Sequence, residues 1–95
     1  MPRTHSTNNT AKAHRAIRLI NIADAKLHHD LKGAESALEM AARWAKLAGF
    51  RYETRMLQDM ALEVRIFEAT PTNWERDTNN LRVSLGGAEI DRMAA

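Results

Sequence analysis

The stretch AESALEMAARWAKLA, residues 34–48, decides the fold of this chain. Its apolar residues recur at steps of three and four, the spacing that places side chains on one face of a helix. The residues on this face are Ala34, Ala37, Leu38, Ala41, Trp44, Ala45 and Ala48. Met40 and Leu47 widen the apolar arc beyond what a helix with a single neighbour requires. We therefore expect a central helix that is buried over most of its circumference.

Apolar residues with the same spacing occur before and after this stretch. The earlier set is Ala13, Ala16, Ile17, Ile20, Ala23, Leu27 and Leu31, and the later set is Tyr52, Met56, Met60, Val64 and Phe67. Asp30 or Gly33 is expected to start the central helix, and Gly49 is expected to end it in a left-handed conformation with Phe50 packed nearby. The sequence thus predicts an all-α protein, a small single-domain bundle of three main helices with a short C-terminal helical piece. The expected helices span about residues 11–30, 33–48 and 51–68.

The C-terminal third of the sequence also allows an α+β alternative. Leu62 and Ile66 lie off the apolar face of the third segment, and within residues 62–68 the apolar residues Leu62, Val64 and Ile66 alternate with polar ones as in a half-buried strand. Residues 81–85, LRVSL, alternate in the same way. The alternative to a continuous third helix is therefore a small hairpin built from these two segments.

The composition is typical of one soluble globular domain. The 95 residues are 44% hydrophobic and 27% charged, and no run reaches the length of a membrane span. Residues 1–10 are polar and have no periodicity, so we expect a flexible basic and polar arm ahead of a helical domain over residues 11–95. The chain has no recognisable secretory signal and no cysteine, which fits a reducing compartment. We expect a cytoplasmic protein that has no membrane partner.

Charge is distributed unevenly along the chain. The net charge is +2, but residues 1–32 hold six Lys or Arg against two Asp, whereas residues 33–95 hold eight against ten acidic residues. A basic segment of this kind supplies salt-sensitive, sequence-independent affinity for nucleic acid. The candidate nucleic-acid-binding residues are Arg3, Lys12, Arg15, Arg18, Lys26 and His29. No aromatic residue lies within this region of the sequence, so a platform for base stacking is missing there.

Apolar residues outside the predicted core faces favour a different function, that of a protein-interaction module. Ile22 lies among the basic residues of the first segment, where a monomer would leave it exposed to water. The candidate partner-binding residues are Ile22, Leu62, Ile66, Trp74 and Leu85. Such a module would be an adaptor, an inhibitor or a regulatory subunit, of the kind found in phages, and its partner would be another protein or a second copy in a homodimer.

No motif in the sequence indicates catalysis. Asp24 and His28 are one helical turn apart, but a metal site needs further ligands that do not occur at a motif spacing. The serines have no base at the spacing of a catalytic motif. A DNA-reading helix-turn-helix buries apolar side chains six and nine places after its turn glycine. Arg55 and Gln58 stand at these places after Gly49, so the sequence does not match that motif. We expect a non-enzymatic binding or regulatory protein with no catalytic residue, metal, cofactor or small-molecule substrate.

Overall fold

The computed structural model describes the backbone of residues 2–86 and the side chains of residues 9–86. The described part of the chain forms four helices and no strand: α1 (Pro2–Lys26), α2 (Leu31–Leu47), α3 (Arg51–Phe67) and α4 (Trp74–Ser84). The all-α prediction is confirmed. The alternative hairpin is wrong, because residues 62–67 continue α3 and residues 81–84 belong to α4. The predicted last helical turns, after Gly87, lie outside the described residues.

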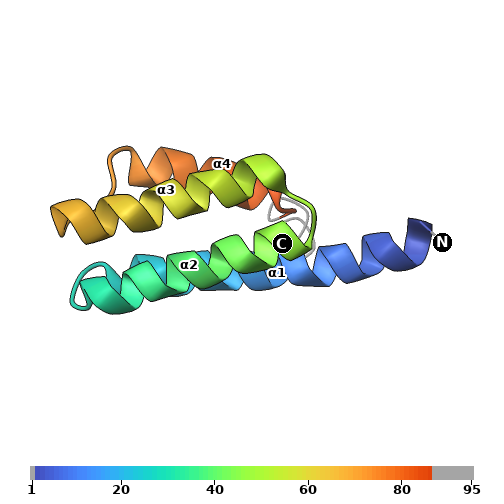
Figure 1. The fold of residues 1–95 in the computed structure, drawn as a ribbon, viewed down its shortest axis with the longest axis horizontal. Coiled ribbons are helices and arrows are strands. Elements are labelled where there is room, and N and C mark those ends of the chain that lie inside the picture. The colour runs from blue at the N-terminus through green and yellow to red at the C-terminus, as the bar shows by residue number, and fades with distance from the viewer. Residues whose placement is uncertain (1, 87–95) are drawn as a thin grey trace, which may run out of the picture.

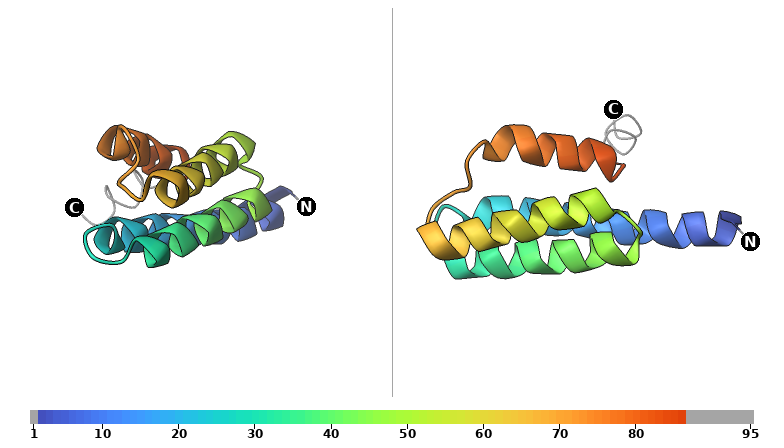
Figure 2. Two further views of the ribbon diagram at one scale, coloured as in Figure 1. Left: turned by 60° about the vertical axis from the view of Figure 1, so that its left-hand side comes forward. Right: turned by 45° about the horizontal axis from the view of Figure 1, so that its top comes forward.

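The four helices form two layers. α1 and α2 make an antiparallel pair, α3 lies over α2, and α4 lies over α1, so that α1 and α3 stand diagonally across the bundle (Figures 1 and 2). α1 begins at Pro2, earlier than the predicted residue 11, and its N-terminal turns project beyond the other helices (Figure 1). These turns include the predicted arm, whose flexibility stays a prediction. No helix in the described part of the chain is long and apolar enough to cross a bilayer.

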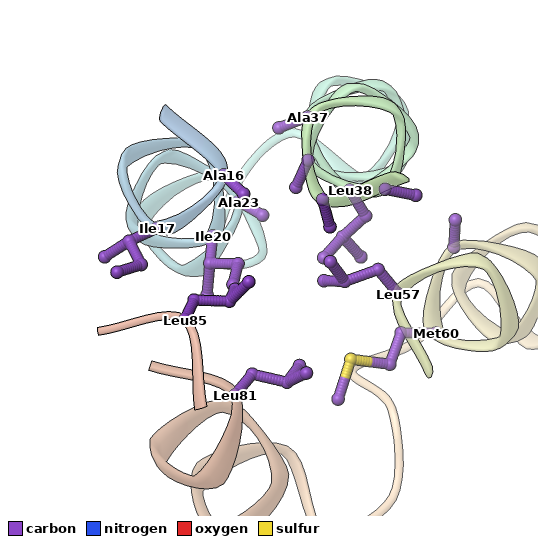
Figure 3. Packing of buried hydrophobic residues seen from close by; sticks show 14 of the residues in the cluster. Ala16, Ile17, Ile20, Ala23, Ala37, Leu38, Leu57, Met60, Leu81 and Leu85 are labelled. Atoms are coloured by element: carbon purple, nitrogen blue, oxygen red, sulfur yellow. The ribbon is translucent and has the colours of Figure 1, made fainter. Parts of the chain in front are cut away.

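The core lies between the layers, where each helix contributes a large apolar side chain. Figure 3 shows Ile20 of α1, Leu38 of α2, Leu57 of α3 and Leu81 of α4 converging on one centre. Their side chains are at most 1% exposed. The alanines predicted for the buried face of α2 are all buried, and the predicted face of α1 is buried from Ala13 to Leu27. Small residues on α2 let the neighbouring helices approach closely, so the central role predicted for this helix is confirmed.

Two apolar faces are narrower or turned further than the sequence indicates. Met40 and Leu47 are 51% and 55% exposed, because α2 is covered by α1 and α3 and not on its third side. Tyr52 and Phe67, predicted on the core face of α3, are each 70% exposed. Side chains four residues apart drift by about 40° around a helix, so the line of such steps from Val64 back to Tyr52 winds away from the core. Phe67 is the last residue of α3. The face that α3 buries consists of Thr54, Leu57, Met60, Ala61 and Val64.

Local signals in the sequence fix both ends of α2. Asp30 is the N-cap residue, and its carboxylate accepts a hydrogen bond from the Gly33 N–H at 2.9 Å. At the other end, Gly49 has a φ of +89°, which an L side chain rarely adopts. The Gly49 N–H donates to the Lys46 carbonyl at 3.0 Å and the Phe50 N–H donates to the Ala45 carbonyl at 2.9 Å. This bonding pattern is a Schellman motif, and the predicted glycine cap is confirmed.

Candidate nucleic-acid interface

The outer side of α1 carries two arginines of the predicted nucleic-acid-binding set, Arg15 and Arg18. Ala13, Ala16, Ile17, Ile20 and Ala23 bury the inner side of the helix. Arg15 and Arg18 are exposed, because the helical step places them about half a turn from that face. The Arg15 guanidinium lies over the Trp44 ring, 4.9 Å from its centroid. This cation–π contact holds the guanidinium at the junction of α1 and α2.

The one carboxylate of α1 lies away from these arginines. Asp24 accepts a hydrogen bond from the indole N–H of Trp74, with 2.6 Å between Asp24 Oδ1 and Trp74 Nε1. This bond ties α1 to α4 on the side of the helix where Asn21 also contacts α4 through Arg82. Ion pairs among the described residues join Lys26 to Asp30 and Arg76 to Asp77. Within that part of the chain, no carboxylate neutralises Arg15 or Arg18.

A shallow groove runs between α1 and α2 beside the arginines. Its volume is about 360 Å³, and it is lined by Arg15, Arg18, Leu19, Ile22, Met40 and Trp44. Ile22 is 44% exposed, as predicted for a residue on the basic side of the helix. The lining contains two cations and no carboxylate, so the groove combines apolar walls with positive charge. Such a surface suits an anionic partner.

The other predicted cations are less available or lie further away. Lys12 is half-buried on α1. The Lys26 ammonium lies 3.5 Å from the Asp30 carboxylate. His29 is exposed in the turn after α1, beyond the groove, and the Arg3 side chain lies outside the description. The geometry therefore concentrates the candidate interface on Arg15 and Arg18.

The structure separates the predicted partner-binding residues into two kinds. Ile22 lies in the groove beside α2, whereas Leu62 and Ile66 are 43% and 59% exposed on the outer side of α3. Trp74 and Leu85 are only 7% and 2% exposed and belong to the core. Both are buried because α4 lies over α1 with its apolar side toward the core. In this fold, Trp74 and Leu85 are therefore not accessible to a binding partner.

Sequence reasoning missed Trp44 and Met40 as surface residues. Both were placed on the buried arc of the central helix, but Met40 is 51% exposed and Trp44 is half-buried. Trp44 supplies the aromatic residue that the basic segment lacks in its own sequence, because the antiparallel packing of α1 and α2 brings it beneath Arg15. The available signal was the position of both residues at the edge of the apolar arc of α2, next to Arg43.

Within residues 9–86, the structure brings no third metal ligand to Asp24 and His28. Asp24 bonds to Trp74, and Asp30 caps α2 through the Gly33 N–H. In residues 9–86, no group of three or more His, Asp or Glu side chains lies close enough to hold a metal ion. The Gly33 N–H, followed by the Lys26 ammonium, lowers the pKa of Asp30 below its ordinary value.

Comparison with known proteins gives no match: no family model fits the chain, and no curated protein and no solved structure is significantly similar to it.

Proposed function

We propose that this chain is a small non-enzymatic protein that binds nucleic acid through the outer side of α1. The observation that carries the proposal is the separation of charge on this helix. Arg15 and Arg18 face outward, and the one carboxylate of α1, Asp24, bonds to Trp74 of α4. Uncompensated cations on one side of a helix attract phosphates and release counterions when they bind them.

The contact with Trp44 indicates what kind of nucleic-acid contact the arginines make. The ring is covered by the Arg15 guanidinium, so it orders that side chain instead of offering an open face to a base. An ordered guanidinium loses less conformational entropy when it binds a phosphate, and its planar donors fit phosphate oxygens. We therefore propose backbone contacts with little sequence preference, made chiefly by Arg15 and Arg18 beside the groove.

Replacing both arginines tests this proposal. The double variant Arg15→Ala and Arg18→Ala should flatten the slope of log affinity against log salt by about one to two units, because each lost phosphate contact removes about one counterion. Binding of a short labelled duplex, measured by fluorescence anisotropy at several salt concentrations, gives this slope. The matched control removes two exposed arginines from other helices, Arg65→Ala and Arg76→Ala, and should keep the parent slope. If both double variants keep the parent slope, α1 is not the binding surface.

A second candidate function, a protein-interaction module, is favoured by one specific observation. Leu62 and Ile66 remain exposed on the outer side of α3, while the apolar side of α4 is buried in the core. Apolar side chains that the core does not use are typical of a contact surface when they occur together. The module would act as an adaptor, an inhibitor or a regulatory subunit.

A further inference from the structure

The outer side of α3 carries a regular row of exposed residues. Tyr52, Arg55, Asp59, Leu62 and Ile66 follow one another at alternating steps of three and four, which is the a and d spacing of a coiled-coil seam. All five are exposed, with Tyr52, Leu62 and Ile66 at 70%, 43% and 59%. The seam points away from Leu57 and Val64, which face the core. We call this row the α3 seam.

The two charges within the α3 seam are not used inside the described part of the chain. Arg55 and Asp59 are four residues apart on one helix, in the order that is less favourable for an intrahelical pair. The ion pairs among the described residues lie elsewhere, between Lys26 and Asp30 and between Arg76 and Asp77. An opposite charge from outside the chain is therefore able to engage each of them.

We propose that the α3 seam binds a second copy of this chain in an antiparallel arrangement centred on Leu57. In this register, Arg55 faces the partner's Asp59, and Asp59 faces the partner's Arg55. Tyr52 faces the partner's Leu62 at one end, and the same pair recurs at the other end by symmetry. Charge thus meets opposite charge in the middle and apolar side chains meet at the flanks, as a self-complementary two-fold interface requires.

Other arrangements of the same seam lose this complementarity. A parallel pair would place Arg55 against the partner's Arg55 and Asp59 against the partner's Asp59, so like charges would meet. An antiparallel pair shifted by one heptad would place Arg55 against the partner's Ile66 and Asp59 against the partner's Leu62. Both charges would then lie beside apolar side chains without a counter-charge. The sequence of the α3 seam therefore selects one orientation and one register.

This self-association is independent of nucleic-acid binding. α1 and α3 stand diagonally across the bundle (Figure 2), so a second copy on the α3 seam leaves the outer side of α1 open. A contact made by one helix from each copy is smaller than a standard interface, so we expect a weak, concentration-dependent dimer. A dimer of this form would carry two basic surfaces on opposite sides.

Charge reversal in the α3 seam tests the proposal. Asp59→Arg places two arginines opposite each other in both central pairs, and Arg55→Asp does the same with two aspartates. Sedimentation equilibrium over a wide concentration range should show each single variant dimerising at least about tenfold more weakly than the parent. The double variant R55D/D59R should return to the parent affinity, because the exchanged charges meet again. Circular dichroism should show parent helicity for all variants, since every changed residue is exposed.

A mixture of the two single variants provides a second measurement. The Asp59→Arg chain has a basic seam and the Arg55→Asp chain an acidic one, so an equimolar mixture should form a heterodimer at least as readily as the parent forms its homodimer. The control Glu39→Arg, an exposed carboxylate on α2, should dimerise like the parent. A parent that is monomeric at every concentration would overturn the proposal. A double variant as weak as the single variants would overturn the register.

Discussion

Asp30 joins α1 to α2 through the two oxygens of its carboxylate. Oδ1 accepts the hydrogen bond from the Gly33 N–H at 2.9 Å, and Oδ2 lies 3.5 Å from Lys26 Nζ. A Cβ at position 33 would meet the same carboxylate, so a larger residue there would displace the Asp30 side chain from its capping position. One residue thus caps the central helix and pairs with the last residue of α1.

At the residue scale, we predict that the contribution of Asp30 to stability depends on pH. Because its pKa in the folded protein is lowered from the ordinary 3.8, the carboxylate stabilises the fold above that pH, and the contribution is lost as the pH falls through the lowered value. Asp30→Ala should therefore lower the Tm clearly at neutral pH and less in acid. The control Glu39→Ala should show a small difference from the parent at both pH values. A Tm gap for Asp30→Ala that is the same in acid would contradict the capping role.

At the element scale, the small side chains on the buried face of α2 allow the helices of the bundle to pack closely. Ala41 and Ala45 are 0% exposed where α2 meets its neighbours, so a larger side chain has no space without moving a helix. Ala41→Leu should lower the free energy of unfolding by about 1–3 kcal/mol through overpacking. Chemical denaturation measures this change. Ala25→Leu, at an exposed position of α1, is the matched control and should have little effect; equal melting of both variants would show that the buried face of α2 is misassigned.

The same scale shows how far periodicity can predict a helix. The face of α1 from Ala13 to Leu27 and the alanines of the α2 face are confirmed, because these residues combine steps of three and four, which stay on one side of a helix. The predicted face of α3 is partly wrong because it follows steps of four from Tyr52 to Val64, which wind around the helix. Leu57 and Ala61, which the structure buries, complete the true face. Which of two neighbouring apolar rows faces the core depends on the position of the other helices.

At the scale of the whole molecule, contacts between residues distant in the sequence determine how the helices are arranged, which the spacing of apolar residues along the chain does not predict. The Asp24–Trp74 hydrogen bond joins residues 50 positions apart and helps to place α4 over α1. The contact of Arg15 with Trp44 depends on the antiparallel pairing of α1 and α2. The cations of the candidate interface were predictable from local composition, but their aromatic neighbour and the groove were not, because both arise when two helices pack together.

The bundle as a whole presents two different outer surfaces on diagonal helices. The surface of α1 is basic and borders a groove with apolar walls. The surface of α3 carries two charged side chains flanked by exposed apolar ones in the α3 seam. We propose that the first binds nucleic acid and the second binds another copy of the chain, and the distance between them across the bundle allows both contacts at once.

The most direct test of nucleic-acid binding locates it on the molecule. Amide chemical shifts followed by NMR during titration with a short DNA duplex report which helix meets the ligand. We predict progressive shifts around Arg15, Arg18 and Ile22 that shrink as salt is added, because phosphate contacts are screened and counterions compete. Shifts confined to α3, or shifts around α1 that do not respond to salt, would contradict the account.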